Sequence, residues 1–214
     1  MSAADFYFYR TLIYICNMKV ESVVLDGKFV RLEPLRFEHL AALCAVGLED
    51  KSIWALTTNV MENSGDMRHY VETALEDFER KVSLPFVTIE KSSNKIVGST
   101  RFGNIDVKNL RAEVGWTWIN PEWQRSYVNT EAKLLMLAHA FEVWECVRVE
   151  FKTDALNEKS RSAILRLGAK EEGVLRRHMI AETGRFRDSV YFSIIDSEWE
   201  DVQINLQSKL KQVY

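Results

Sequence analysis

The spacing of apolar residues along the chain predicts a mixed α/β protein. Apolar residues that alternate with polar ones are typical of strands, and apolar residues three and four positions apart are typical of helices. On this basis we expect strands at residues 28–35, 85–90, 95–102, 111–119, 147–153, 170–180 and 189–195. We expect helices at 37–44, 66–78, 130–144, 157–167 and about 197–211.

The resulting order is β-α-α-β-β-β-α-β-α-β-β-α, which predicts a single mixed sheet of about seven strands flanked by helices, in the α+β type of the α/β class. Strands two to four form an antiparallel meander. Asp66 is the expected N-cap of the second helix, and Asn129 or Thr130 that of the third. Gly168 ends the fourth helix, and residues 182–185 form the turn of a terminal hairpin.

The first apolar stretch, residues 6–16, differs from a signal peptide. It carries Arg10 in its middle and lacks a basic leader and a small-residue cleavage site. We therefore expect residues 1–18 to form an N-terminal extension that contributes little to function. Residues 19–214 then form one domain that ends in the helix at about 197–211.

Composition and charge narrow the classes of function. Of 214 residues, 47% are apolar, and the net charge of −3 gives no overall field for holding nucleic acid or an anionic membrane. Three cysteines without C-x-x-C spacing favour a reducing compartment, here the cytoplasm. The four histidines lack metal-ligand spacing, so we expect no metal site, and no apolar run is long enough to span a bilayer.

The segment with the clearest chemistry is residues 111–130. A strand is followed by the turn at 120–123 and by residues 124–130, which open a long apolar helix. The N-terminus of a helix presents unpaired N–H groups and the positive end of the helix dipole. Such a place binds anions and above all phosphate. An ordinary capped helix, with Glu131 complementing the dipole, is the alternative interpretation.

Here the sequence resembles the GNAT superfamily of acyl-CoA N-acyltransferases, and within it the RimJ/RimL-like branch that acetylates the N-termini of ribosomal proteins. The resemblance covers about residues 24–196. It rests on the segments Arg31-Leu32-Glu33-Pro34-Leu35, Ile96-Val97-Gly98, Glu113-Val114-Gly115-Trp116, Asn129-Thr130-Glu131-Ala132-Lys133, Asn157-Glu158-Lys159-Ser160 and Leu167-Gly168-Ala169, and on Arg185, Arg187, Asp188 and Tyr191 near the end.

The resemblance implies that acetyl-CoA is the co-substrate. The residues that it assigns to coenzyme binding are Trp118 and Ile119 through their backbone, the loop Gln124, Arg125, Ser126, Tyr127, Val128, Asn129 and Thr130, and Asn157 and Lys159. Tyr127 and Asn129 stand where the family's Q/R-x-x-G-x-G/A loop has glycines. Since Asn tolerates left-handed dihedrals, Asn129 is able to replace the second glycine.

The resemblance also suggests three catalytic residues. Glu113 matches a position from which some relatives deprotonate the amine, although a surface carboxylate paired with Arg111 or Arg101 is equally compatible with the sequence. Asn157 and Ser160 share one helix face and match residues that meet the departing thiol. Asn157 is also a plain N-cap candidate.

The expected function is therefore transfer of acetyl to a primary amine by direct attack in a ternary complex. Because deprotonating a lysine at pH 7 costs roughly 4.6 kcal/mol and an α-amine about 1 kcal/mol, a protein N-terminus or another weakly basic amine is favoured. Alternatives are a small-molecule amine, another acyl-CoA, or a CoA-binding sensor without turnover, which Tyr127 makes credible. We expect a monomer or a homodimer that binds neither nucleic acid nor membranes.

Overall fold

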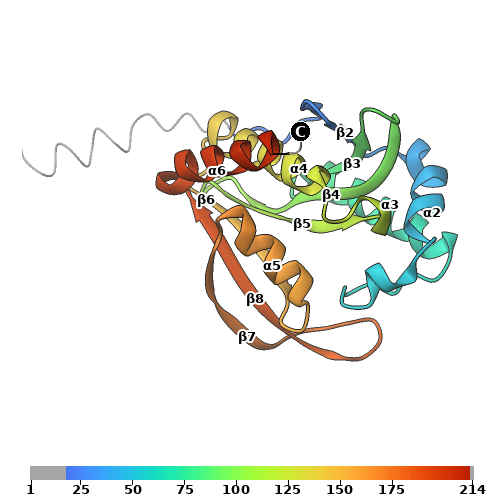
Figure 1. The fold of residues 1–214 in the computed structure, drawn as a ribbon. Helices are drawn as coiled ribbons and strands as arrows, with labels where there is room; N and C mark the ends of the chain where they lie inside the picture. Colours follow the sequence, from blue (N-terminus) through green and yellow to red (C-terminus); the bar gives the residue numbers. More distant parts are fainter. Residues whose placement is uncertain (1–17, 213–214) are drawn as a thin grey trace, which may run out of the picture.

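The computed structural model describes residues 18–212, which form one mixed sheet of eight strands flanked by helices (Figure 1). The order across the sheet is β1-β2-β3-β4-β5-β6-β8-β7. The strands are β1 (Leu25–Asp26), β2 (Val30–Pro34), β3 (Leu84–Glu90), β4 (Lys95–Asp106), β5 (Arg111–Ile119), β6 (Arg148–Asp154), β7 (Lys170–Ile180) and β8 (Phe186–Ile195). The strand beyond the expected seven is β1, which pairs with β2 over two residues.

Helices cover both faces of the sheet (Figure 1). They are α2 (Leu40–Gly47), α3 (Ser64–Glu79), α4 (Tyr127–Ala138), α5 (Glu158–Leu167) and α6 (Trp199–Lys211), with short helical turns at Phe37–His39, Lys51–Trp54, Pro121–Trp123, His139–Val143 and Asp196–Glu198. Side chains of α4, α5 and α6 share the larger core with the sheet. Side chains of α2 and α3 form the smaller core on the opposite face, together with Trp118 of β5.

The N-cap of α3 lies three residues earlier than predicted. Its N-cap is Asn63, whose Oδ1 accepts hydrogen bonds from the amides of Gly65 at 2.7 Å and Asp66 at 3.3 Å. In return the Asp66 carboxylate accepts a hydrogen bond from the Asn63 amide at 3.0 Å, which completes a capping box. The prediction of Asp66 as N-cap is therefore wrong, because Asp66 is the third helical residue of this reciprocal pair.

The helix predicted at 157–167 is confirmed at both ends. Asn157 is the N-cap, and its Oδ1 accepts from the Ser160 amide at 3.0 Å. Gly168 ends the helix with φ of 106°, in the left-handed region that glycine adopts without steric cost. This geometry places Asn157 and Ser160 together at the end of β6.

The predicted N-terminal extension falls almost entirely on residues 1–17, which lie outside the described residues. Met18, which we assigned to that extension, is only 4% exposed and belongs to the larger core. Next to it, the backbone carbonyl of Lys19 accepts a hydrogen bond from Trp144 Nε1 at 3.0 Å. The packed part of the chain therefore includes Met18.

Candidate functional site

The strands β5 and β6 run parallel but pair over only three residues each. Arg111–Glu113 pairs with Arg148–Glu150, after which no register is formed between the two strands. β5 continues to Ile119 and β6 to Asp154, and Figure 1 shows β6 and β8 turning away from β5. The backbone of residues 114–119 thus has no ladder partner on the β6 side. We call residues 114–119 and 151–154 the β5–β6 divergence.

A bulge distorts β5 within the divergence. Opposite β4, the pairing passes from Arg101 with Gly115 to Ser99 with Trp118, so that Trp116 and Thr117 together face Thr100. Trp116 has φ of 48°, which is uncommon for a residue with a large side chain. Its ring lies against the Arg101 guanidinium, 5.3 Å from centroid to Cζ. Bulges of this kind redirect side chains near functional sites.

The loop after β5 leads directly into α4. Gln124 Nε2 donates to the carbonyl of Ile119 at 3.0 Å, which holds the loop against the end of the strand. Arg125 has φ of 60°, and Ser126 is the N-cap, with its Oγ accepting from the Val128 amide at 3.2 Å. The expectation of Asn129 or Thr130 as cap is therefore wrong: the helix begins one turn earlier and continues beyond Ala138 as a π-helical turn.

The two residues that replace glycines adopt ordinary dihedrals. Among the described residues with positive φ, neither Tyr127 nor Asn129 occurs; the left-handed residue of this loop is Arg125. The idea that Asn129 supplies a left-handed conformation is thus wrong. The Tyr127 hydroxyl donates to Glu90 Oε1 at 2.9 Å and its ring packs 4.9 Å from that of Phe29, so the side chain is directed to the ends of β2 and β3.

Glu90 is built to hold this tyrosine. Burial raises the pKa of its carboxyl, but hydrogen bonds from Ser93 and Ser92 outweigh burial and lower the pKa to about 2. The group is therefore a carboxylate at neutral pH, and charge-assisted hydrogen bonds of this kind are strong. Tyr127 is consequently anchored away from the first amides of α4.

The first turn of α4 retains groups able to bind an anion. The first amides of a helix have no partner within the helix, and Ser126 satisfies only that of Val128. In the same turn Asn129 Oδ1 is buried and accepts no hydrogen bond from any described residue. A buried polar atom without a partner is costly, so a water or a ligand group that donates a hydrogen bond to this oxygen is favoured, whereas an anion binds to the free amides.

The predicted residues of α5 lie at its N-terminus. Asn157 and Ser160 are half-buried, and Lys159 is exposed. The side-chain carbonyl of Asn157 caps α5, as expected if Asn157 is a plain N-cap residue. The Ser160 hydroxyl makes no hydrogen bond to any residue that the structure describes.

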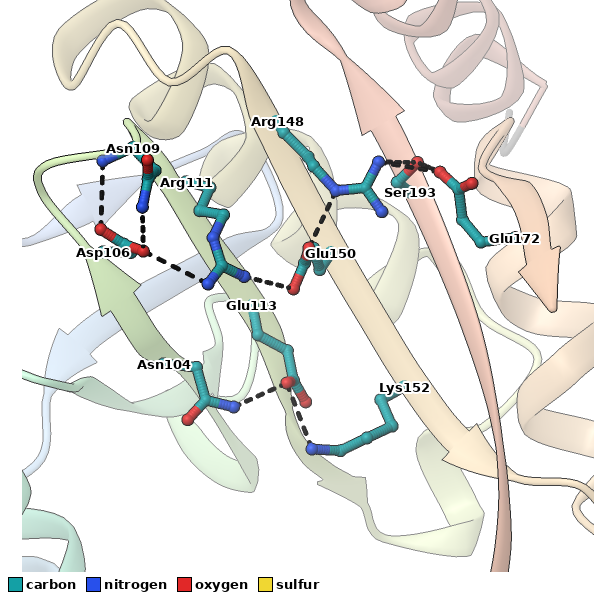
Figure 2. A network of polar contacts seen from close by, with 10 residues as sticks. All are labelled: Asn104, Asp106, Asn109, Arg111, Glu113, Arg148, Glu150, Lys152, Glu172 and Ser193. Carbon is teal, nitrogen blue, oxygen red and sulfur yellow. Dashed lines mark hydrogen bonds and ion pairs between the residues drawn. The ribbon is translucent and has the colours of Figure 1, made fainter. Parts of the chain in front are cut away.

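Glu113 lies at the beginning of the divergence, within a network of charged side chains on β4, β5, β6 and β7 (Figure 2). It is 3% exposed, accepts a hydrogen bond from Asn104 Nδ2 at 2.8 Å and forms an ion pair with Lys152 at 3.3 Å. The expected alternative partners, Arg111 and Arg101, are wrong: Arg111 bonds to Asp106 and Glu150, and Arg101 is stacked on aromatic rings.

An open pocket of about 830 Å³ borders this network. Its lining includes the carboxylates of Asp106, Glu113 and Glu150, with Tyr191 and Leu175 completing the wall. Arg148 on β6 ties Glu150 to Glu172 of β7, with bonds of 2.8 Å to each (Figure 2). Arg111 also lines the pocket, and each of the three carboxylates is paired with a basic side chain, so the wall is polar and its charges are largely balanced.

Sequence reasoning missed Lys133 as a functional candidate. Lys133 is buried between α4 and the sheet. Its ammonium donates hydrogen bonds to Thr100 Oγ1 at 2.8 Å and to Thr117 Oγ1 at 2.6 Å. No carboxylate pairs with it among the described residues. Burial lowers the pKa of Lys133 to about 7. The available signal was a lysine inside a helix that is apolar around much of its circumference.

Residues 18–212 contain neither a metal-binding cluster nor a membrane-spanning helix. No cluster of three or more His, Cys, Asp or Glu side chains within this part of the chain is arranged to hold a metal ion. None of its helices combines the length and apolarity needed to cross a membrane.

The lowered pKa of Lys133 predicts a pH dependence of stability. In the unfolded chain the amine keeps its usual pKa near ~10.4, so between pH 7 and 10 the unfolded state binds more protons and stability rises with pH. In Lys133→Met this contribution is absent. We expect the unfolding free energy of the wild type to gain about 1.4 kcal/mol per pH unit relative to the variant. Denaturant unfolding at pH 7.5, 8.5 and 9.5 measures it; a constant difference contradicts it.

The comparisons with known proteins agree with this geometry. The family model described as "Acetyltransferase (GNAT) domain" matches residues 30–170. A Bacillus subtilis protein named "Putative ribosomal N-acetyltransferase YdaF" is 31% identical over 79% of this chain and 91% of its own length. A GCN5-related N-acetyltransferase from Brucella melitensis has a TM-score of 0.81 and 30% identity, and the match covers 88% of this chain and 85% of that one.

A more distant structure shares the fold. RimJ of Mycobacterium smegmatis, solved in complex with CoA-disulfide, has a TM-score of 0.73 at 23% identity over 88% of this chain and 92% of its own. Because the family model spans most of the chain, including β5, the loop and α4, the resemblance seen in the sequence is confirmed. The chain belongs to the GNAT family and is an acetyltransferase.

Proposed function

We propose that this enzyme moves an acetyl group from acetyl-CoA to a primary amine by direct attack in a ternary complex. The observation that carries the proposal is the β5–β6 divergence beside the N-terminus of α4. The unpaired backbone of β5 lies next to the unpaired first amides of α4. One extended molecule is therefore able to bind to both places, with a diphosphate at the helix amides and an amide-containing arm along the strand.

The residues of this chain fit such a co-substrate. In our proposal the backbone of residues 124–130 binds the diphosphate, the backbone of Trp118 and Ile119 binds the arm, and Asn157 and Lys159 complete the site at α5. The unpaired first amides of α4 and the Tyr127 side chain held by Glu90 support the diphosphate assignment. The unpartnered Asn129 oxygen is able to accept a hydrogen bond from an amide of the arm. Acetyl-CoA, when bound, supplies the activated thioester. The Ser160 hydroxyl and the Asn157 side chain then stabilise the departing thiolate by hydrogen bonding.

Glu113 is the proposed base. It lies where β5 and β6 begin to diverge, and its carboxylate is one of three that line the open pocket beside Arg111, where an amine from solvent is able to reach it. Its carboxylate forms an ion pair with Lys152 at 3.3 Å. A carboxylate is a weak base, so removal of a proton is easier from an α-amine than from a lysine side chain. This supports a protein N-terminus or another weakly basic amine as acceptor.

Acetyl transfer to two matched peptides tests the function. One peptide has a free α-amine and no lysine; the other has a blocked N-terminus and one lysine. With acetyl-CoA at pH 7 we expect thiol release and a matching gain in peptide mass, at least about 10-fold faster for the α-amine. Equal or faster lysine acetylation contradicts the acceptor class. Tight CoA binding without transfer to either peptide or to small amines supports the sensor, and absence of CoA binding overturns the proposal.

The assignment of Ser160 predicts a loss of turnover. In Ser160→Ala we expect kcat to fall on the order of 10-fold because one hydrogen bond to the thiolate is lost, with the Kd for CoA changed by less than about 3-fold. Ser162→Ala, on the same helix and exposed, is the matched control and is expected to behave like the wild type. An unchanged kcat in Ser160→Ala removes Ser160 from the mechanism.

The assignment of Glu113 predicts a pH-dependent defect. General base catalysis contributes typically about 10²–10⁴-fold, and it matters most where the acceptor is protonated. In Glu113→Gln we therefore expect kcat/KM to fall about 100-fold at pH 6.5 to 7 and progressively less towards pH 9, where free amine is abundant. Glu76→Gln, an exposed glutamate on α3, is the control and is expected to behave like the wild type at every pH. A defect of equal size at every pH contradicts a base role.

A further inference from the structure

Lys133, Thr100 and Thr117 form a hydrogen-bonded group that the proposed function does not yet use. The ammonium of Lys133 donates to both threonine hydroxyls, at 2.8 Å and 2.6 Å, and the two hydroxyl oxygens are 2.8 Å apart. Lys133 is 5% exposed and Thr100 1% exposed, whereas Thr117 is exposed. A buried cation therefore reaches the surface of the protein through one hydroxyl.

The hydrogen bonds determine what the Thr117 hydroxyl is able to do. An ammonium only donates, so both threonine oxygens act as acceptors towards Lys133. Thr100 has two longer alternatives for its hydrogen, the Gly115 carbonyl at 3.4 Å and Met136 Sδ at 3.6 Å, so the Thr117 oxygen at 2.8 Å is its best-placed acceptor. The Thr117 oxygen then accepts two hydrogen bonds. Its own hydrogen has only a long hydrogen bond to the Gly115 carbonyl, at 3.3 Å, and is available to a better-placed acceptor on a ligand.

Thr117 has the position that such an acceptor requires. It lies in the bulge of β5, inside the β5–β6 divergence, one residue before Trp118 and Ile119. Lys133 belongs to the helix whose first turn carries the proposed diphosphate site, and Asn129, with its unpartnered oxygen, precedes it by one helical turn on the same face. In the proposed binding mode, an arm that lies along residues 114–119 and reaches the first turn of α4 is adjacent to Thr117.

We propose that the Thr117 hydroxyl donates a hydrogen bond to the carbonyl oxygen of the acyl thioester, and that Lys133 is the residue that positions and polarises it. This rests on the proposed function. When the amine nitrogen bonds to the acyl carbon, the carbonyl π electrons move to this oxygen; when the C–S bond breaks, the electron pair leaves with sulfur. The proton of Thr117 stays on Thr117 throughout, and its bond strengthens while the oxygen is negative.

The charge of Lys133 depends on burial alone. No charged side chain contributes to the lowered pKa of Lys133 in the part of the chain that is described. On the same helix, Glu131 is turned to the amides of residues 28–30, and His139 packs against Phe102 and Trp144 with its own pKa lowered by burial. Lys133 is thus mainly charged below pH 7 and mainly neutral above it.

The test compares four variants by steady-state kinetics with acetyl-CoA and the α-amine peptide. In Thr117→Val we expect kcat to fall roughly 100-fold, as for removal of an oxyanion donor, with the KM for acetyl-CoA within about 3-fold. Thr117→Ser retains the hydroxyl and is expected to recover most of the rate. Thr73→Val, an exposed threonine on α3, is the control.

The variant Lys133→Met tests whether Lys133 acts on the Thr117 hydroxyl or only supports the fold. We expect the ratio of wild-type to variant kcat to be about 10-fold at pH 6 and to decrease as the pH rises through 7, because the wild type loses the charge that polarises Thr117. A ratio that stays constant with pH contradicts the role of Lys133. Thr117→Val at the wild-type rate, or a defect confined to KM, overturns the proposal.

These outcomes are distinct from failure of the proposed function. If the wild type acetylates neither peptides nor small amines, the proposed acetyl transfer is wrong, and no thioester carbonyl is present for Thr117 to bind. If the wild type is active and Thr117→Val is equally active, only the present inference fails. Should Thr117→Val fail to fold, the pair Thr117→Ser and Lys133→Met still decides, because loss of the rate in folded Thr117→Ser contradicts a role of the hydroxyl.

Discussion

The shortness of the β5–β6 ladder is the constraint on which the rest of the site depends. Ion pairs close the paired end: Arg111 bonds to Glu150 at 3.2 Å, and Arg148 to the same carboxylate at 2.8 Å. Beyond Glu113, β6 follows β8 in a seven-residue antiparallel register, while β5 remains with β4. Each strand is thus held by a different neighbour, and their facing edges stay unpaired. That unpaired backbone is what a coenzyme arm is able to bind.

The position of α4 is fixed by a second polar contact. The Glu131 carboxylate accepts hydrogen bonds from the amides of Lys28, Phe29 and Val30, at 2.9, 2.7 and 2.6 Å. Gly27 makes this approach possible, since a Cβ there would lie 2.7 Å from the Glu131 carboxyl carbon. Glu131 is therefore more than a charge near the helix dipole: it attaches the helix to the turn between β1 and β2. With one face attached there, the opposite face of α4 presents Asn129 and Lys133 to β5.

The sequence predicts the elements better than the contacts between them. Element order, the antiparallel meander and the cap of α5 follow from local periodicity and local hydrogen bonding, as Asn157 and Gly168 show. The errors concern choices among neighbouring polar residues: Asn63 and Ser126 cap helices for which Asp66, Asn129 and Thr130 were equally suitable by type. Lys152 as the partner of Glu113, like the threonines around Lys133, depends on strands that meet only in the folded sheet.

The bulge at Trp116 places Glu113 and Thr117, both on β5, on opposite sides of the sheet. In a regular strand, residues four apart point to the same side, so Glu113 and Thr117 would share a face. Val114 pairs with Phe102 on the side of α4, whereas Trp118 packs with α2 and α3 on the other side. The extra residue in the bulge reverses which side of the sheet the following side chains face. Thr117 therefore points to Lys133, whereas Glu113 contacts Lys152 at the open pocket. A positive φ at Trp116 is the backbone strain that accompanies this arrangement. A carboxylate and a hydroxyl thereby lie at the same divergence on opposite sides of the sheet, because one extra residue in β5 reverses the direction of the side chains that follow it.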